Sequence, residues 1–320
     1  MQELTTTRTN HSIDPVLHIW HGEIPLYLFL GGVVAGIMIL TGLWFLLRPT
    51  TQRSTTLSLI PWASPVLLSV GMFFLWLDLE HPLNAWRFYL TFKVGSPMSW
   101  GAWILLVIYP AAILLAWVGS PTATRQRWLD RLSAVPQLGR LSDWASTNVR
   151  YVALANVVMG TALGIYTGVL LGTMAARPLW NSAILGPLFL VSGLSTGVAF
   201  ILLYRVADSE RVLLSKLDMG LITAEIALIA LWLITLASGG AAARSAVALF
   251  FGGPYTAAFW TLVVALGLVA PLVAEIIEHR HKVVPGRVTA VLVLMGGFAL
   301  RWIVVFAGQH SGWVSELAQR

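Results

Sequence analysis

The residues best suited to chemistry in this sequence are ionisable and phenolic side chains at the ends of long apolar segments. His21 precedes the first segment and Asp78 ends the second. Tyr166 lies in the second, outer half of the fourth segment, and Arg177 lies just beyond it. A histidine with a neighbouring carboxylate can accept and release protons near neutral pH. Phenol and guanidinium groups donate hydrogen bonds. Together these groups suit the head of a quinone or quinol, which needs a donor or acceptor at each end. The simpler alternative is that they are helix-end residues that meet water.

A second set of charged residues lies within the later apolar segments. Ionisable groups inside a membrane are costly, and they often mark functional sites. A possible proton path comprises Asp218, Glu225 and Glu275 on the inner side, and Arg301 in the outer half of the last segment. As alternatives, Glu225 could pair with Lys216 or Arg211, and Glu275 could belong to a solvated helix end. Arg301 could instead be a structural clamp that binds carbonyls or a carboxylate, with Asp78 as the partner at matching depth.

Several redox centres are excluded by the residues that the chain lacks. It has no cysteine, which excludes disulfides, thiolate metal sites and cysteine-ligated iron–sulfur clusters. A buried haem would need histidine ligands inside the apolar segments, but all seven histidines lie in loops or at segment ends. We therefore expect no haem, no iron–sulfur cluster and no metal centre in this chain. If it takes part in redox chemistry, electrons must pass between a bound quinone and a separate subunit.

The composition identifies an integral membrane protein. Of its 320 residues, 57% are hydrophobic and only 11% are charged, whereas soluble domains carry about a quarter charged residues. The net charge of +6 is explained by Lys and Arg in cytoplasmic loops, so we do not expect a nucleic-acid partner.

Apolar segments of membrane-spanning length occur eight times, and backbone hydrogen bonding in lipid requires them to be helices. They cover about residues 24–47, 62–79, 98–118, 149–174, 183–204, 219–238, 255–277 and 287–308. Thirteen of the 20 Lys and Arg residues lie in the loops after the odd-numbered segments. The positive-inside rule then places those loops in the cytoplasm, and both termini and the quinone site on the periplasmic side of a bacterial inner membrane. The longest loop, between 119 and 149, combines Arg with Trp and Leu, which suits the cytoplasmic interface.

A weak internal repeat predicts two pseudo-repeated four-helix bundles in a single membrane domain, 1–320. Its halves would be 24–174 and 183–308. PLYL before GxxxG in the first segment is echoed by PLFL before GxxxG in the fifth. Such small-residue faces allow close helix packing, and chance similarity between glycine-rich helices is the alternative.

Together, the order and spacing of several motifs resemble the NrfD/PsrC family of polysulfide-reductase-type membrane subunits. The motifs are PLYLFLGGVVAG (25–36), LDLEHP (77–82), WRF (86–88), SPMSWGAW (96–103), YTGVLL (166–171), RPLWN (177–181) and SGLSTG (192–197). The resemblance implies a site for menaquinone or ubiquinone near the periplasmic face, with His21 and Tyr166 as the contacting pair. It also implies a ferredoxin-like iron–sulfur partner, often beside a molybdopterin or multihaem catalytic subunit. The family's Gly-Arg pair after Asp78 is replaced here by Glu80-His81, for which Arg87 is the possible substitute.

These expectations describe a quinone-reactive subunit in which His21 and Tyr166 hold the quinone head and Asp78 relays protons. Two other functions are compatible with the sequence. A proton or solute transporter would need a continuous polar route with a site at the midplane, whereas the polar groups here gather near the two faces. A non-catalytic anchor of a redox complex would bind no quinone.

Overall fold

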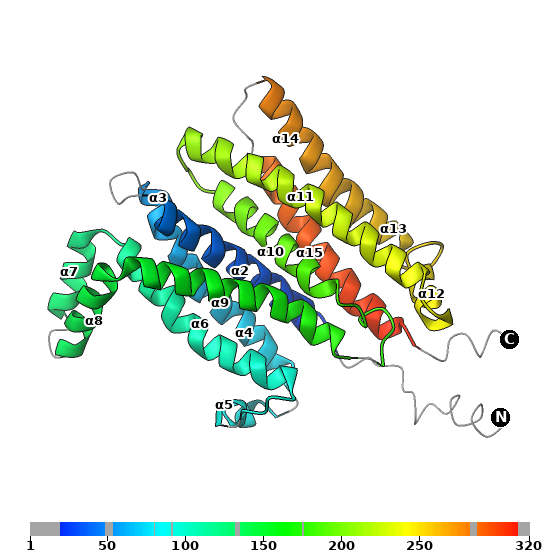
Figure 1. Ribbon diagram of the computed structural model, residues 1–320, viewed down its shortest axis with the longest axis horizontal. Helices are drawn as coiled ribbons and strands as arrows, with labels where there is room; N and C mark the ends of the chain where they lie inside the picture. The colour runs from blue at the N-terminus through cyan, green and yellow to red at the C-terminus, as the bar shows by residue number, and fades with distance from the viewer. Residues whose placement is uncertain are drawn as a thin grey trace.

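A computed structural model describes residues 20–48, 54–79, 81–90, 92–131, 135–174, 176–281 and 287–312, and this part of the chain is entirely helical. Eight helical spans are long and apolar enough to cross a membrane, as the hydropathy predicted. They are α2 (Glu23–Leu47), α3–η2–α4 (Thr55–Leu77), α6 (Pro97–Gly119), α9 (Val149–Gly172), α10 (Leu185–Leu202), α11 (Asp208–Ala237), α13–η4–α14 (Thr256–His281) and α15 (Arg287–His310). Figure 1 shows these helices running roughly side by side.

Some segments are longer or more helical than the sequence indicated. Helix α11 begins at Asp208, eleven residues before the predicted start at 219. Its first turn is acidic, which the helix dipole favours, and the Glu210 carboxylate accepts a hydrogen bond from the Ala207 amide (3.3 Å). The loop between 119 and 149 contains two amphipathic helices, α7 (Thr122–Arg131) and α8 (Pro136–Thr147). Hydropathy did not predict these helical residues, because they lack the apolar content of a membrane span.

The two glycine faces identified in the sequence pack directly on each other. A Cβ on Gly36 of α2 would collide with the Gly193 carbonyl oxygen of α10, and one on Gly197 would lie 2.7 Å from the Gly36 backbone. Gly193 in turn lies against Gly32. The two backbones therefore meet without intervening side chains.

Helices α2 and α10 lie at the centre of the bundle. Helix α2 packs on α4, α9 and α10, while α10 also packs on α9, α11 and α15. Figure 1 shows α4, α6 and α9 on one side of this pair, and α11, α14 and α15 on the other. Because α9 also packs on α10, the interface between these groups is continuous. The internal repeat itself stays a prediction.

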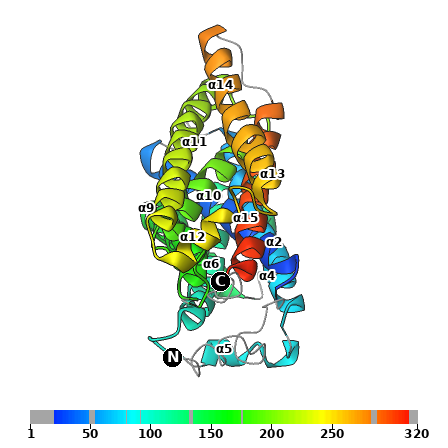
Figure 2. The same ribbon diagram turned by 90° about the vertical axis from the view of Figure 1, so that its right-hand side faces the viewer.

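One end of the bundle, here called the His21 end, holds the residues predicted for the quinone site. Helix α2 begins there and α15 ends there, since the Trp20 amide and the Gln309 side chain are hydrogen-bonded (3.0 Å). Helix α4 ends there, and the short helices η3 (Pro82–Asn84) and α5 (Arg87–Leu90) follow it. Figure 2 shows α5 and α12 (Ala241–Ala248) at this same end.

Candidate quinone site and buried acidic groups

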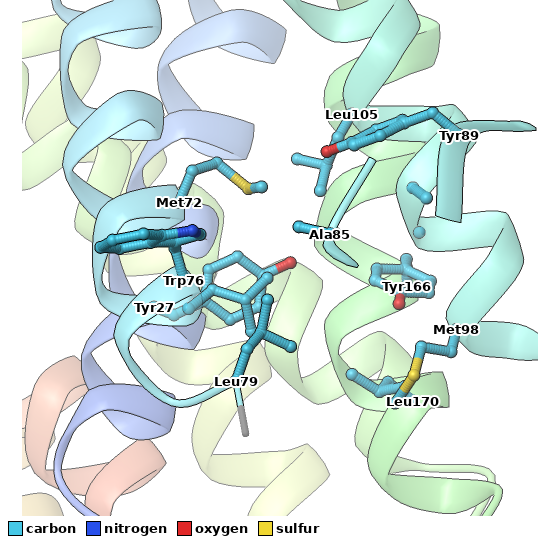
Figure 3. Close-up of a pocket in the computed structure, with 13 residues that line it drawn as sticks. Tyr27, Met72, Trp76, Leu79, Ala85, Tyr89, Met98, Leu105, Tyr166 and Leu170 are labelled. Carbon is cyan, nitrogen blue, oxygen red and sulfur yellow. The ribbon is translucent and has the colours of Figure 1, made fainter. Parts of the chain in front are cut away.

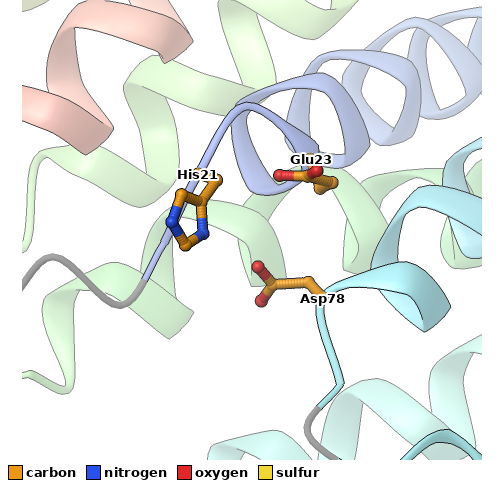
Figure 4. Close-up of side chains that lie close together, drawn as sticks. All are labelled: His21, Glu23 and Asp78. Carbon is orange, nitrogen blue, oxygen red and sulfur yellow. The ribbon is translucent and has the colours of Figure 1, made fainter.

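Three ionisable side chains meet at the His21 end. His21 directly precedes α2, Glu23 is in its first turn, and Asp78 caps the C-terminus of α4. One ligand-type atom from each side chain lies within 4.8 Å of the other two. Figure 4 shows Asp78 approaching His21 and Glu23 from the neighbouring helix. The structure therefore brings the predicted residues His21 and Asp78 together and adds Glu23. We call these three residues the His21 triad.

The electrostatics of the His21 triad are unusual for a site near a protein surface. Partial burial, together with the adjacent Glu23 carboxylate, raises the pKa of Asp78, while His21 lowers it by a smaller effect. Glu23 Oε2 is buried and has no hydrogen-bond partner among the described residues. A buried carboxylate oxygen without a donor favours the binding of a cation.

An apolar pocket lies beside the His21 triad, lined by α2, α4, α6, α9 and the segment that contains α5. Its volume is about 150 Å³, comparable to a cavity that holds one benzene ring. Figure 3 shows Tyr27 and Tyr89 with their hydroxyl groups directed into it from opposite sides. Burial, and then the nearby Tyr109, raise the pKa of Tyr89, so that its phenol stays protonated and can donate a hydrogen bond. The pocket can therefore hold a ring whose oxygens need donors.

Helix geometry connects the pocket to the His21 triad. Tyr27 follows Glu23 by four residues, which places both on one face of α2. Trp76 and Leu79, which line the pocket, flank Asp78 in sequence. A group bound in the pocket would therefore lie next to the helix ends that carry the triad.

Tyr166, predicted from the sequence, lines the same pocket and is 7% exposed. Its phenol packs directly on Gly101 of α6, where an added Cβ would collide with the ring and the hydroxyl. The glycine thus creates the space that Tyr166 occupies. His21 itself is not among the lining residues, so the pocket and the triad are adjacent parts of one site.

Arg177 lies outside the lining of this pocket, and its predicted role in quinone binding stays a prediction. It is 5% exposed and absent from the pocket lining. Its Nη1 donates to the carbonyls of Gln309 and Ser311, both at 3.2 Å. Gln309 in turn holds the backbone of Trp20, the residue before His21 (both bonds 3.0 Å). Arg177 therefore stabilises the loop that positions His21, and does not face the pocket.

Arg301 is fully buried between α15, α10 and α2. It donates to Ser192 Oγ (3.0 Å) and to the carbonyls of Gly297 (2.8 Å) and Phe189 (3.2 Å). These contacts correct the suggestion that Asp78 is its partner, because depth in the membrane did not reveal which helix Arg301 faces. The clamp role considered from the sequence is the one that the contacts describe.

The buried acidic residues form a polar chain that continues from Arg301. Ser192 is also hydrogen-bonded to Glu225, which lies within electrostatic range of Arg301 and Asp218. The alternative partner Arg211 instead donates to the carbonyls of Leu202 (3.3 Å) and Tyr204 (2.9 Å).

Farther along α11, serines accompany the remaining carboxyl groups. Ser195 Oγ donates to Asp218 Oδ1 (2.7 Å), and Ser215 is hydrogen-bonded to Glu275. Asp218 and Glu275 are each 1% exposed, and each has one oxygen without a hydrogen-bond partner in the described chain. This arrangement can hold or transfer protons.

Several residues of these sites were not predicted from the sequence as site residues. They are Glu23, Tyr27, Trp76, Tyr89, Gly101, Ser192, Ser195 and Ser215. Two spacings were available as signals: Glu23 and Tyr27 four apart, and Ser192 and Ser195 three apart, each pair on one helix face. Glu80, beside the predicted His81, lies outside the described residues.

Comparison with known proteins agrees with this architecture. The family model described as "Polysulphide reductase, NrfD" matches residues 8–311. The chain belongs to this family. NrfD family membership and the eight apolar helices together identify a multi-pass membrane protein and support its role as a membrane subunit of a reductase complex.

Three relatives show how far the similarity to NrfD proteins extends. Protein NrfD of Escherichia coli is 29% identical, with 91% of this chain and 95% of the relative covered. One chain of the polysulfide reductase of Wolinella succinogenes is also 29% identical, with coverage of 91% and 94%. One subunit of the tetrathionate reductase of Salmonella typhimurium is 26% identical, over 71% of this chain and 60% of the relative.

Proposed function

We propose that this protein is the quinone-reactive membrane subunit of a respiratory oxidoreductase complex. The observation that carries the proposal is the apolar pocket with three phenols, next to the His21 triad. The pocket volume fits one ring, and Trp76 and Met98 at its rim are 43% and 52% exposed. This rim leaves a way out into lipid for an isoprenoid tail.

In the proposed mechanism, the protein orients the quinone head and handles its protons. A bound quinol supplies two electrons and two protons. The phenols of Tyr166 and Tyr27 hydrogen-bond the head, and the apolar walls exclude water. Asp78 and His21 accept the released protons near the surface. Because this chain has no cysteine, the electrons pass to another subunit.

The partners follow from the family and the relatives. We propose a ferredoxin-like iron–sulfur subunit that docks above the His21 end, together with a molybdopterin or multihaem catalytic subunit. Two relatives are named as parts of polysulfide and tetrathionate reductases, which favours reductase complexes of this general type. The positive-inside rule supports a periplasmic location of the His21 end in the inner membrane, and the quinone is menaquinone or ubiquinone.

A Tyr166→Phe substitution tests the site with little change in packing. In the assembled complex, we expect quinol-linked turnover to fall about tenfold, equivalent to roughly 1.4 kcal/mol of lost stabilisation. Tyr151→Phe is the matched control, because Tyr151 is on the same helix but 69% exposed. Full quinol-linked turnover in a Tyr166→Phe complex would reject the assignment. Absence of bound quinone in the purified complex would favour the anchor alternative.

We further propose that Asp218, Glu225, Glu275 and Arg301, with the intervening serines, form a proton path. Its contacts lie among α10, α11, α14 and α15, and no described hydrogen bond joins it to the His21 triad. Asp218→Asn and Glu275→Gln complexes should retain quinol turnover in detergent but lose proton movement in proteoliposomes. Normal proton movement in both would reject the path. Solute uptake by the isolated chain would instead favour the transporter alternative.

A further inference from the structure

We infer that the His21 triad binds a single divalent metal ion of the Zn²⁺ class, and that occupancy of this site inhibits quinol-linked turnover. The three ligands are one imidazole nitrogen of His21 and one carboxylate oxygen each from Glu23 and Asp78. Binding depends only on this geometry, whereas inhibition rests on the proposed quinone function. The inference departs from the sequence-based expectation of no metal site.

The three ligand atoms are close enough for one ion. They lie within 4.8 Å of one another, whereas ligands at Zn²⁺ distances of about 2.0–2.2 Å in a tetrahedron are roughly 3.4 Å apart. The difference of about 1.4 Å is within the reach of carboxylate side-chain rotation. No movement of either helix is needed.

The charge in the His21 triad calls for a cation. Two carboxylates lie close together, and the charged groups that act on Asp78 are the Glu23 carboxylate and His21. Glu23 Oε2 is buried without a hydrogen-bond partner in the described chain. A metal ion would supply the missing positive charge and a ligand bond for this oxygen.

The chemistry of the ligands selects the class of metal. An imidazole ligand beside carboxylates favours Zn²⁺ and similar transition metals, whereas Ca²⁺ and Mg²⁺ prefer six or more oxygen ligands. Three protein ligands leave one position for water, as in open zinc sites.

The ligands are carried by firmly held backbone. Trp20, next to His21, is fixed by two hydrogen bonds with the Gln309 side chain: its amide donates to Oε1, and its carbonyl accepts from Nε2 (3.0 Å each). Gly22 packs on Trp302, where a Cβ would lie 3.2 Å from the ring. Asp78 closes the last turn of α4 through its own amide, which donates to the Phe74 carbonyl (3.3 Å). The site is therefore largely formed before an ion arrives.

Inhibition follows because the metal and the proton use the same lone pairs. A metal ligand must be deprotonated, so a bound ion removes His21 and Asp78 as proton acceptors. Quinol in the adjacent pocket then has no group in the His21 triad to receive its protons.

The experiment measures Zn²⁺ binding and turnover on the intact purified complex. We expect the complex to retain one Zn²⁺ against a competing chelator dye, and X-ray absorption to show only nitrogen and oxygen ligands. Quinol turnover should fall when Zn²⁺ is bound and recover when EDTA removes it. Glu23→Gln keeps the side-chain volume and is outside the proposed proton relay. It should weaken Zn²⁺ binding about 10- to 100-fold and relieve the inhibition equally. His310→Ala, at the same end of the bundle, should change neither the Zn²⁺ affinity nor the inhibition of turnover.

The outcomes separate the two parts of the inference. Zn²⁺ binding that is equal in the parent and Glu23→Gln complexes would overturn the site. Stoichiometric binding that Glu23→Gln weakens, without any effect on turnover, would retain the metal site. It would reject both the inhibition and the proposed proton transfer to His21 and Asp78.

Discussion

At the scale of single residues, the pocket depends on one glycine as much as on its tyrosines. Gly101 has no side chain, and the Tyr166 phenol occupies the space where its Cβ would be. The atoms that a Cβ at position 101 would meet belong to the Tyr166 side chain, which can rotate. A larger residue at position 101 would therefore displace the phenol and leave the helix in place. Functional damage without unfolding is therefore expected at this position.

Gly101→Ala should lower quinol-linked turnover about tenfold, equal to roughly 1.4 kcal/mol, because the displaced phenol no longer faces the quinone head. Turnover of the assembled complex and its bound quinone content are the measurements. Gly220→Ala is the control, since a Cβ at Gly220 in α11 would meet nothing within 4 Å. Equal turnover and quinone content in the two variants would contradict the proposed role.

Gln309 offers a second test at this scale, because it supports His21 from a distance. Gln309→Leu removes both hydrogen bonds to Trp20 and should destabilise the protein by about 1–3 kcal/mol. It should also weaken quinol-linked turnover by releasing the residue before His21. Thermal unfolding and turnover are measured together, with Gln137→Leu on exposed α8 as the control. A stable variant with full turnover would show that this contact does not position His21.

At the scale of secondary structure, the contact between α2 and α10 restricts the sequence most, because only glycine fits where the two backbones meet. Four glycines bring the two helices into backbone contact, and hydrophobic burial gives little drive for this association inside lipid. Close packing must supply the stability, so small residues matter more here than polar ones. Helix α2 also carries His21, Glu23 and Tyr27, which couples this contact to the site.

Gly36→Leu should therefore prevent correct assembly of the bundle. The new side chain would enter the Gly193 and Gly197 backbone, and overpacking costs about 1–3 kcal/mol or more. We expect a lower Tm and reduced accumulation in membranes. Gly220→Leu, at an open position of another spanning helix, should retain the parent Tm. A shared Tm for both variants would show that α2 and α10 are not in close contact.

At the scale of the whole molecule, the orientation in the membrane decides which face meets the redox partner. The positive-inside rule predicts that the His21 end is periplasmic. Because the chain contains no cysteine, single-cysteine variants can report orientation without background labelling.

Gly95→Cys and Gly139→Cys are suited to this test, because a Cβ at either position would meet no atom within 4 Å. Gly95 precedes α6 at the His21 end, and Gly139 lies in α8 at the opposite end. In intact spheroplasts, a membrane-impermeant maleimide should label Gly95→Cys and spare Gly139→Cys, and permeabilised cells should label both. The reverse pattern would place the His21 end in the cytoplasm.

The sequence by itself determined the membrane class, the eight spans and the two glycine faces, whereas the structure showed that these faces pack on each other. These features depend on local composition: apolar length defines a span, and glycine spacing defines a helix face. The order of short motifs also indicated the family resemblance, and the match over residues 8–311 confirmed it.

Only the tertiary structure decided which side chains meet. Hydropathy indicates the depth of a residue in the membrane, but it does not indicate which neighbouring helix that residue faces. For this reason Arg301 was matched by depth with Asp78, although it binds α10. The contact of Arg177 with the end of α15 was likewise not predicted. The His21 triad arises in the same way, because the rotation and packing of α2 and α4 bring Glu23 and Asp78 together from distant positions in the chain.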